Sequence, residues 1–207
     1  MKKNQWKLRD ILMMSILGVL FAAVYLAVFS GGMVLSALLT PTGLSTFSFE
    51  LIYGVWFMAS AVAAYIIRKP GAALTTEVLA AGVELLMGNA GGLVVILTGF
   101  IQGLGCELGF AAFRYRKFNL LSMTLGGILA ASFIFLFELY YLQNYLLAPG
   151  LLFAKLMVRF LSAALFTGLI SKLSCDGLAR TGVLKNYGID RSRQEVLIER
   201  EEEFVHE

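Results

Sequence analysis

Residues 11–29, ILMMSILGVLFAAVYLAVF, form a run without a single charged side chain near the start of the chain. A helix needs roughly 20 apolar residues to cross the ~30 Å hydrocarbon core of a bilayer, and this run is long enough. The hydrophobic part of a secretory signal peptide spans only ~7–15 residues before a small-residue cleavage site. The run therefore predicts a retained membrane-spanning helix.

Similar stretches follow it and raise the number of predicted spans to six, at about 9–30, 48–67, 71–88, 93–113, 119–143 and 151–174. The composition agrees, because 58% of the residues are hydrophobic, 15% are charged and the mean hydropathy is +0.78, far from the usual globular mix. We predict an all-α polytopic membrane protein. Residues 1–184 would form one transmembrane domain, followed by a charged cytoplasmic tail at 185–207.

The basic residues predict the orientation of these spans. In the first part of the chain Lys and Arg are confined to residues 2–9, 68–69 and 114–117, and the outer loops expected at 31–47 and 88–92 contain none. Positive charge collects on the cytoplasmic side of membrane proteins. Both termini are therefore expected inside, and the net charge of +3 reflects this bias and does not indicate nucleic-acid binding.

Several kinds of chemistry are not expected. The sequence has no phosphate-binding loop of the G-x-x-x-x-G-K-[ST] type, and its one histidine, His206, lies in the tail. Cys106 and Cys175 are far apart and lack the paired spacing of a metal site or a disulfide. We therefore expect no enzyme, no cofactor and no metal, and favour a binding or transport role.

Ionisable side chains nevertheless fall in or at the edges of the predicted spans. They are Glu50, Glu77, Glu84, Glu107, Glu138, Lys155 and Arg159. A charge at the centre of a membrane helix costs about 2.5–3.5 kcal/mol on insertion scales, so such residues usually face a cavity or a partner. From the direction of each helix, Glu77 and Glu107 are expected in the inner half of the bilayer and the other five in the outer half.

The outer group has two interpretations. In the first, Lys155 and Arg159 neutralise Glu84 and Glu138 in an internal network. In the second, the group lines a polar cavity that is open to the outside and captures a cationic or hydrogen-bonding solute. Three outer acids against two bases leave one carboxylate unpaired, which favours a cavity for at least one glutamate.

Small residues recur at helical spacing in two spans, and such spacing lets membrane helices approach closely. In the fourth span they are Gly99, Gly103, Gly105 and Gly109, and we expect internal packing there. In the first span they are Gly18, Ala22, Ala23 and Ala27, which would suit either internal packing or docking of another membrane protein.

Several blocks, in order, resemble the YkoE family of substrate-binding S components of energy-coupling factor (ECF) vitamin transporters. They are LRD at 8–10, ELIYGVWFMA at 50–59, AAYIIRKPGAA at 63–73, EVLAA at 77–81, ELLMGN at 84–89, QGLGCEL at 102–108 and FRYRK at 113–117. The resemblance covers about residues 8–180 and leaves the tail unassigned.

The resemblance implies a six-helix S component with both termini inside and a solute site near the outer surface of a bacterial cell membrane. Such proteins work with a transmembrane T subunit and two cytoplasmic ATPase domains, and this group is associated with thiamine or its hydroxymethylpyrimidine precursor. It also implies that the small-residue stripe of the first helix docks on the T subunit.

The residues suit such a solute. A carboxyl group can engage the ring nitrogen and exocyclic amine of an aminopyrimidine together, and the fixed charge of a thiazolium suits an aromatic face or a carboxylate. We expect Glu84 or Glu138 to bind the pyrimidine, whereas Lys155 and Arg159 would instead suit a phosphorylated ligand. The predicted substrate-binding residues are Glu50, Tyr53, Trp56, Glu84, Asn89, Gln102, Glu138 and Tyr141.

Two alternatives stay open. One is a self-contained, proton-coupled secondary carrier with Glu77 and Glu107 as a relay, although such carriers usually show internal repeats and none is visible. The other is a membrane scaffold protein whose buried charges are purely structural.

Overall fold

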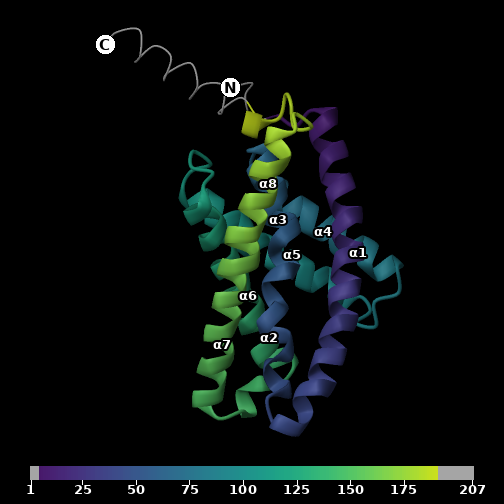
Figure 1. Ribbon diagram of the computed structural model, residues 1–207, viewed down its shortest axis with the longest axis vertical. Coiled ribbons are helices and arrows are strands. Elements are labelled where there is room, and N and C mark those ends of the chain that lie inside the picture. Colours follow the sequence, from purple (N-terminus) through teal and green to yellow (C-terminus); the bar gives the residue numbers. More distant parts are fainter. Residues whose placement is uncertain (1–4, 191–207) are drawn as a thin grey trace.

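The computed structural model describes residues 5–190, and all of the regular secondary structure in this range is helical. The longest helices, near the start and the end of the chain, run along the length of an elongated bundle, and helices from the middle of the chain cross it obliquely (Figure 1). In chain order they are α1 (Leu8–Leu39), the short turns η1 (Thr40–Thr42) and η2 (Ser45–Phe47), α2 (Ser48–Ile52), η3 (Tyr53–Phe57), α3 (Met58–Ile67), α4 (Ala72–Leu86), α5 (Val94–Ala112), α6 (Leu120–Tyr141), η4 (Asn144–Leu146), α7 (Pro149–Ala163), η5 (Ala164–Ile170) and α8 (Ser171–Arg180).

Five of these helical segments are long and apolar enough to cross a membrane: Leu8–Thr42, Ser45–Ile67, Val94–Ala112, Leu120–Tyr141 and Pro149–Arg180. The chain is therefore a multi-pass membrane protein. The remaining predicted span corresponds to α4, which has 15 residues and at ~1.5 Å per residue is shorter than the hydrocarbon core. Six crossings with both termini inside thus stay a prediction.

The first helix is longer than expected. We predicted its end near residue 30, but α1 continues through Gly31 and Gly32 to Leu39. The apolar sequence after the two glycines holds no proline before Pro41, so nothing breaks the helix. Much of the expected outer loop at 31–47 is consequently helical.

The glycines of α5 bring it into close contact with its neighbours, as predicted. A Cβ on Gly99 would lie 2.4 Å from the Cβ of Ala81 in α4. On the other side, a Cβ on Gly109 would lie 2.3 Å from the Cα of Gly126 in α6. Neither position has room for a side chain, so α5 is held between α4 and α6.

The small-residue stripe of α1 is divided between two surfaces. Gly18 and Ala22 are buried, and a Cβ on Gly18 would lie 3.1 Å from the Cβ of Leu79 in α4. Ala23 and Ala27 are exposed. The expectation that all four residues form one docking surface needs correction, because the first pair is used to pack α1 against α4.

Two irregular turns meet in the middle of the bundle. The 3₁₀ turn η3 separates α2 from α3, and the π-helical turn η5 separates α7 from α8. The Gly54 N–H donates to the Ser162 hydroxyl at 3.0 Å, and the Thr167 hydroxyl donates to the Gly54 carbonyl at 2.9 Å. Side chains of α7 and η5 thus form hydrogen bonds with the backbone N–H and carbonyl groups of η3. Irregular backbone at membrane depth is tolerated where protein covers it in this way.

Both ends of the described chain lie at the same end of the bundle (Figure 1). The Tyr187 hydroxyl donates to the carbonyl of Arg9 at 3.2 Å, and the ammonium of Lys69 lies 2.5 Å from the carboxylate of Asp10. Ile189 is buried, so the first residues of the predicted tail pack on the bundle. The remainder of that tail, including His206, lies outside the described residues.

Candidate functional site

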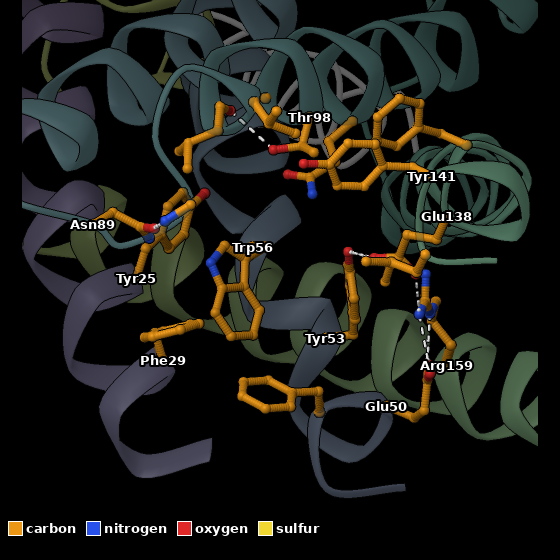
Figure 2. A pocket seen from close by; sticks show the side chains of 18 of the residues that line it. Tyr25, Phe29, Glu50, Tyr53, Trp56, Asn89, Thr98, Glu138, Tyr141 and Arg159 are labelled. Carbon is orange, nitrogen blue, oxygen red and sulfur yellow. Dashed lines mark hydrogen bonds and ion pairs between the residues drawn. The ribbon is translucent and has the colours of Figure 1, made fainter. Parts of the chain in front are cut away.

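A cavity of about 500 Å³ lies between the helices, near the end of the bundle opposite the termini. Its walls come from α1, α2, η3, α4, α5, α6 and α7. Its size falls within the ~300–1,000 Å³ that is typical of small-molecule sites. In Figure 2, Asn89 lies on one side of the hollow, Glu138 and Arg159 lie on the other, and Trp56 lies between them.

Every predicted substrate-binding residue lines this cavity. They are Glu50, Tyr53, Trp56, Glu84, Asn89, Gln102, Glu138 and Tyr141. Their contact with a solute stays a prediction, and their positions divide them into two groups with different surroundings.

The wall formed by α2, α6 and α7 holds a charge-balanced network. Arg159 donates to Glu50 from Nε at 2.6 Å and from Nη2 at 3.0 Å, and Nη2 also lies 2.6 Å from Glu138. Lys155 lies 3.3 Å from Glu50. The Tyr53 hydroxyl donates to Glu138, and the Arg159 guanidinium lies 3.8 Å above the Tyr53 ring. Two acids and two bases thus neutralise one another.

The pairing differs from the predicted network in one member. We expected Lys155 and Arg159 to neutralise Glu84 and Glu138, but Glu50 takes the place of Glu84. The reason is the order of helices around the bundle: α7 packs on α2 and α6, whereas α4 lies against α1, α3 and α5.

Glu84 is the carboxylate left over. It is 3% exposed and lines the cavity from α4. The Asn89 amide donates to its Oε1 at 2.6 Å, and the indole of Trp56 is also within hydrogen-bonding reach. In the part of the chain that the structure describes, no basic side chain forms an ion pair with it. The two side chains that reach it, Asn89 and Trp56, are both neutral.

Glu77, which the alternative of a proton-coupled carrier paired with Glu107 as a relay, lines the same cavity. Its Oε2 accepts hydrogen bonds from the Tyr25 hydroxyl at 3.2 Å, from the Ser60 N–H at 3.1 Å and from the Ser60 hydroxyl at 2.7 Å. Sequence reasoning did not include Glu77 among the cavity residues, because the direction of a helix does not show that the cavity extends along α4 from Glu84 to Glu77.

Glu107 serves the structure instead. Its carboxylate accepts from the backbone N–H groups of Gly71 at 2.6 Å, Ala73 at 3.0 Å and Leu74 at 3.2 Å, and so caps the start of α4. The Tyr115 hydroxyl donates to it at 2.7 Å. Burial, together with this hydrogen bond, raises the pKa of Tyr115. A carboxylate engaged in this way is a helix cap and not the predicted relay partner of Glu77.

A chain of aromatic rings forms the floor between the two polar walls. Trp56 has ring centroids 5.7 Å from Tyr53, 6.3 Å from Phe49 and 6.4 Å from Tyr25. Across the cavity, Tyr141 stacks on Phe137 at 5.1 Å. Sequence reasoning missed Tyr25, because the first helix was interpreted as a packing or docking surface; a lone tyrosine within an aliphatic run was the available signal.

No group of three or more His, Cys, Asp or Glu side chains within residues 5–190 is arranged to hold a metal ion. Cys106 and Cys175 are both buried and unpaired with one another.

Comparison with known proteins gives three similarities. A family model described as "ABC-type cobalt transport system, permease component" matches residues 9–133. The putative HMP/thiamine permease protein YkoE of Bacillus subtilis (strain 168) is 40% identical over 188 residues, which cover 91% of this chain and 92% of that protein. A crystal structure of an S-component of an ECF transporter superposes with a TM-score of 0.88 at 38% identity, covering 96% of this chain and 98% of the other.

Proposed function

Because the chain belongs to the YkoE family and is an S component of an ECF transporter, we propose that its cavity captures thiamine or the hydroxymethylpyrimidine precursor of thiamine. Of the similar proteins, the one from B. subtilis carries HMP/thiamine in its name. The further support comes from the chemistry of the cavity.

The observation that carries the proposal is the unpaired carboxylate of Glu84 in an aromatic cavity. An aminopyrimidine places an exocyclic amine beside a ring nitrogen. The amine can donate to the carboxylate of Glu84, and the amide of Asn89, whose nitrogen lies 2.6 Å from that carboxylate, can donate to the ring nitrogen. Hydrogen bonds that involve an ionised group are about twice as strong as neutral ones. Glu138, the other predicted pyrimidine ligand, is already engaged by Arg159 and Tyr53.

The aromatic floor supplies the second part of the recognition. The rings of Trp56, Tyr53 and Tyr141 line the cavity, and planar heterocycles stack on such faces. A cation over an aromatic face gains about 0.5–2 kcal/mol, with more when water is excluded. A thiazolium ring therefore fits the floor by both shape and charge.

The two bases do not favour a phosphorylated solute. Lys155 and Arg159 are already balanced by Glu50 and Glu138, so an incoming phosphate would add negative charge to a wall without spare positive charge. Two further carboxylates, Glu77 and Glu84, face the same space. The proposed solute is accordingly the unphosphorylated form.

Transport requires energy that this chain does not supply from any recognisable nucleotide site, since the sequence lacks a phosphate-binding loop. We propose that a transmembrane T subunit and cytoplasmic ATPase subunits provide it, in a bacterial cell membrane with both termini inside. Ala23 and Ala27, which are small and exposed on α1, would offer the docking surface for the T subunit.

Binding by the purified protein tests the proposal. Titration calorimetry without ATP should detect thiamine binding, and Glu84→Gln should weaken it more than tenfold. Asp176→Asn is the matched control, because it makes the same carboxylate-to-amide change at a partly exposed i, i+4 ion pair outside the cavity. Equal affinity of the wild-type and Glu84→Gln proteins would refute the role of Glu84.

Vesicle uptake separates the transport classes. Uptake of labelled thiamine should require co-expressed T and ATPase subunits and ATP. Uptake by this chain alone, driven by a pH gradient, would instead favour a secondary carrier.

A further inference from the structure

Glu77 presents one bare oxygen to the cavity. Its side chain is almost fully buried, with 1% of the residue exposed, and it lines the cavity wall. All three of its hydrogen bonds, from Tyr25 and Ser60, end on Oε2. Within the described residues Oε1 accepts no hydrogen bond, and it is not among the buried atoms that are sealed off without a partner. The carboxylate is thus held in place through Oε2, while Oε1 has no hydrogen bond from a described residue.

The geometry of α4 pairs this oxygen with Glu84. The two glutamates are seven residues apart, which is two helical turns, so they lie on the same face about 10 Å apart along the axis. Neither has an ion-pair partner in the described part of the chain, although Lys155 and Arg159 line the same cavity. Both bases are used on the opposite wall.

The groups that donate hydrogen bonds to Glu77 are all neutral. The partner that Glu77 lacks is therefore a positive charge. Hydroxyl and amide N–H groups orient a carboxylate, but they bring no countercharge. A buried carboxylate is stabilised best when it is both hydrogen-bonded and paired with a positive charge. The Tyr25 hydroxyl donates to Glu77, the rings of Tyr25 and Trp56 have centroids 6.4 Å apart, and both residues line the cavity, so they can provide faces on which a flat cation rests.

We propose that Glu77 supplies the countercharge for a permanently cationic group of the solute, while Glu84 recognises a hydrogen-bonding group of the same molecule. This inference rests on the proposed function and narrows it. A solute with both features, an aminopyrimidine joined to a quaternary ring, satisfies both carboxylates. A neutral aminopyrimidine satisfies Glu84 and leaves Glu77 without a countercharge. Glu77 therefore determines selectivity for thiamine over hydroxymethylpyrimidine.

A comparison of two ligands against two variants tests this. We expect wild-type protein to bind thiamine more tightly than hydroxymethylpyrimidine in titration calorimetry. Glu77→Gln keeps an acceptor for Tyr25 and Ser60 but removes the charge. It should weaken thiamine binding at least tenfold and change hydroxymethylpyrimidine binding less than twofold. Glu84→Gln, the matched variant two turns away, should weaken both ligands.

The outcomes separate the two levels of the proposal. A Glu77→Gln protein that loses affinity equally for both ligands, or for neither, would overturn the selective role of Glu77 and leave the proposed function standing. Wild-type protein that binds neither ligand would refute the proposed function, and the inference with it.

A gentler variant covers the case in which Glu77→Gln does not fold, as judged by thermal unfolding in detergent. Ser60→Ala removes the 2.7 Å hydroxyl contact to Glu77 and keeps the backbone donor. It should weaken thiamine binding about threefold and leave hydroxymethylpyrimidine binding unchanged. A Ser60→Ala protein with unaltered thiamine affinity, or with parallel losses for both ligands, would overturn the inference.

Discussion

The two walls of the cavity carry the same kind of side chain in opposite circumstances. On the α2, α6 and α7 wall, Glu50 and Glu138 are saturated by Arg159 and Lys155. On the α4 wall, Glu77 and Glu84 have hydrogen bonds but no countercharge among the described residues. The difference shows that burial alone does not make an acid a candidate for ligand binding. The candidate is the buried acid whose neighbours supply no countercharge.

The largest effect is expected from removing the centre of the balanced wall. Arg159→Met keeps much of the side-chain volume but leaves Glu50 and Glu138 buried without their guanidinium. Loss of one partner from a buried pair typically costs about 3–5 kcal/mol. The free energy of unfolding, measured by denaturation in detergent, should fall by about this amount.

Arg180→Met is the matched control for that measurement, because Arg180 is exposed at the end of α8. It should change the stability little. A loss of less than about 1 kcal/mol in Arg159→Met would mean that the balanced wall does not depend on its arginine.

An intermediate effect should distinguish the acids of the two walls. Glu138→Gln removes an ion pair with Arg159, and hydrogen bonds to charged groups contribute about 1.5–3 kcal/mol, so stability should fall within that range. Glu84→Gln removes an unpaired buried charge and should change stability by less than about 1 kcal/mol. Thermal unfolding of both variants in detergent provides the measurement.

For binding, the order of these two variants should reverse. Glu84→Gln should lose more than tenfold in thiamine affinity, whereas Glu138→Gln should stay within a few-fold of the wild-type value. A larger loss of thiamine affinity in Glu138→Gln than in Glu84→Gln would contradict the assignment of Glu84 to solute binding and of Glu138 to the ion-pair network.

The smallest effect is expected at Lys155. Its ammonium has one contact in the balanced wall, 3.3 Å from Glu50, and its side chain is 11% exposed. Because Glu50 keeps two hydrogen bonds from Arg159, Lys155→Met should cost less stability than Arg159→Met and leave thiamine affinity within twofold, by the same calorimetry. A tenfold change in thiamine affinity would indicate that Lys155 contacts the solute. It would also support the alternative of a phosphorylated solute.

Much of the fold was predictable from the long sequence segments that hold few or no charged residues. Apolar runs of membrane length located the helical segments, since few other structures accommodate them. The end of α1 was not predictable in this way. Gly31 and Gly32 suggest the end of a helix, but in this apolar sequence the helix continues past them to Leu39. The 3₁₀ and π-helical turns at η3 and η5 were not predicted either, because they depend on contacts between segments that are far apart in sequence.

The site was predictable in membership but not in pairing. Charged residues within spans tend to face a cavity, and Glu50, Glu84 and Glu138 line this one; Tyr25 and Glu77 line it too and were not among the predicted binding residues. Which acid meets which base depends on the order of helices around the bundle, about which a hydropathy pattern says nothing. That missing order explains why Glu50, and not Glu84, pairs with Lys155 and Arg159.

The π-helical turn at η5 fixes the rotational phase of the last helix. Each residue advances an α-helix by about 100°, and a π turn accommodates one extra residue without extending the ordinary repeat. Upstream of the turn, Arg159 faces the cavity; downstream of it, Ser171 and Cys175 face the interior. If residues 164–170 wound as a regular α-helix with no residue removed, α8 would turn by about 100° and expose its buried face to lipid, whereas deleting one residue there would restore a uniform helix and keep α8 in its present orientation.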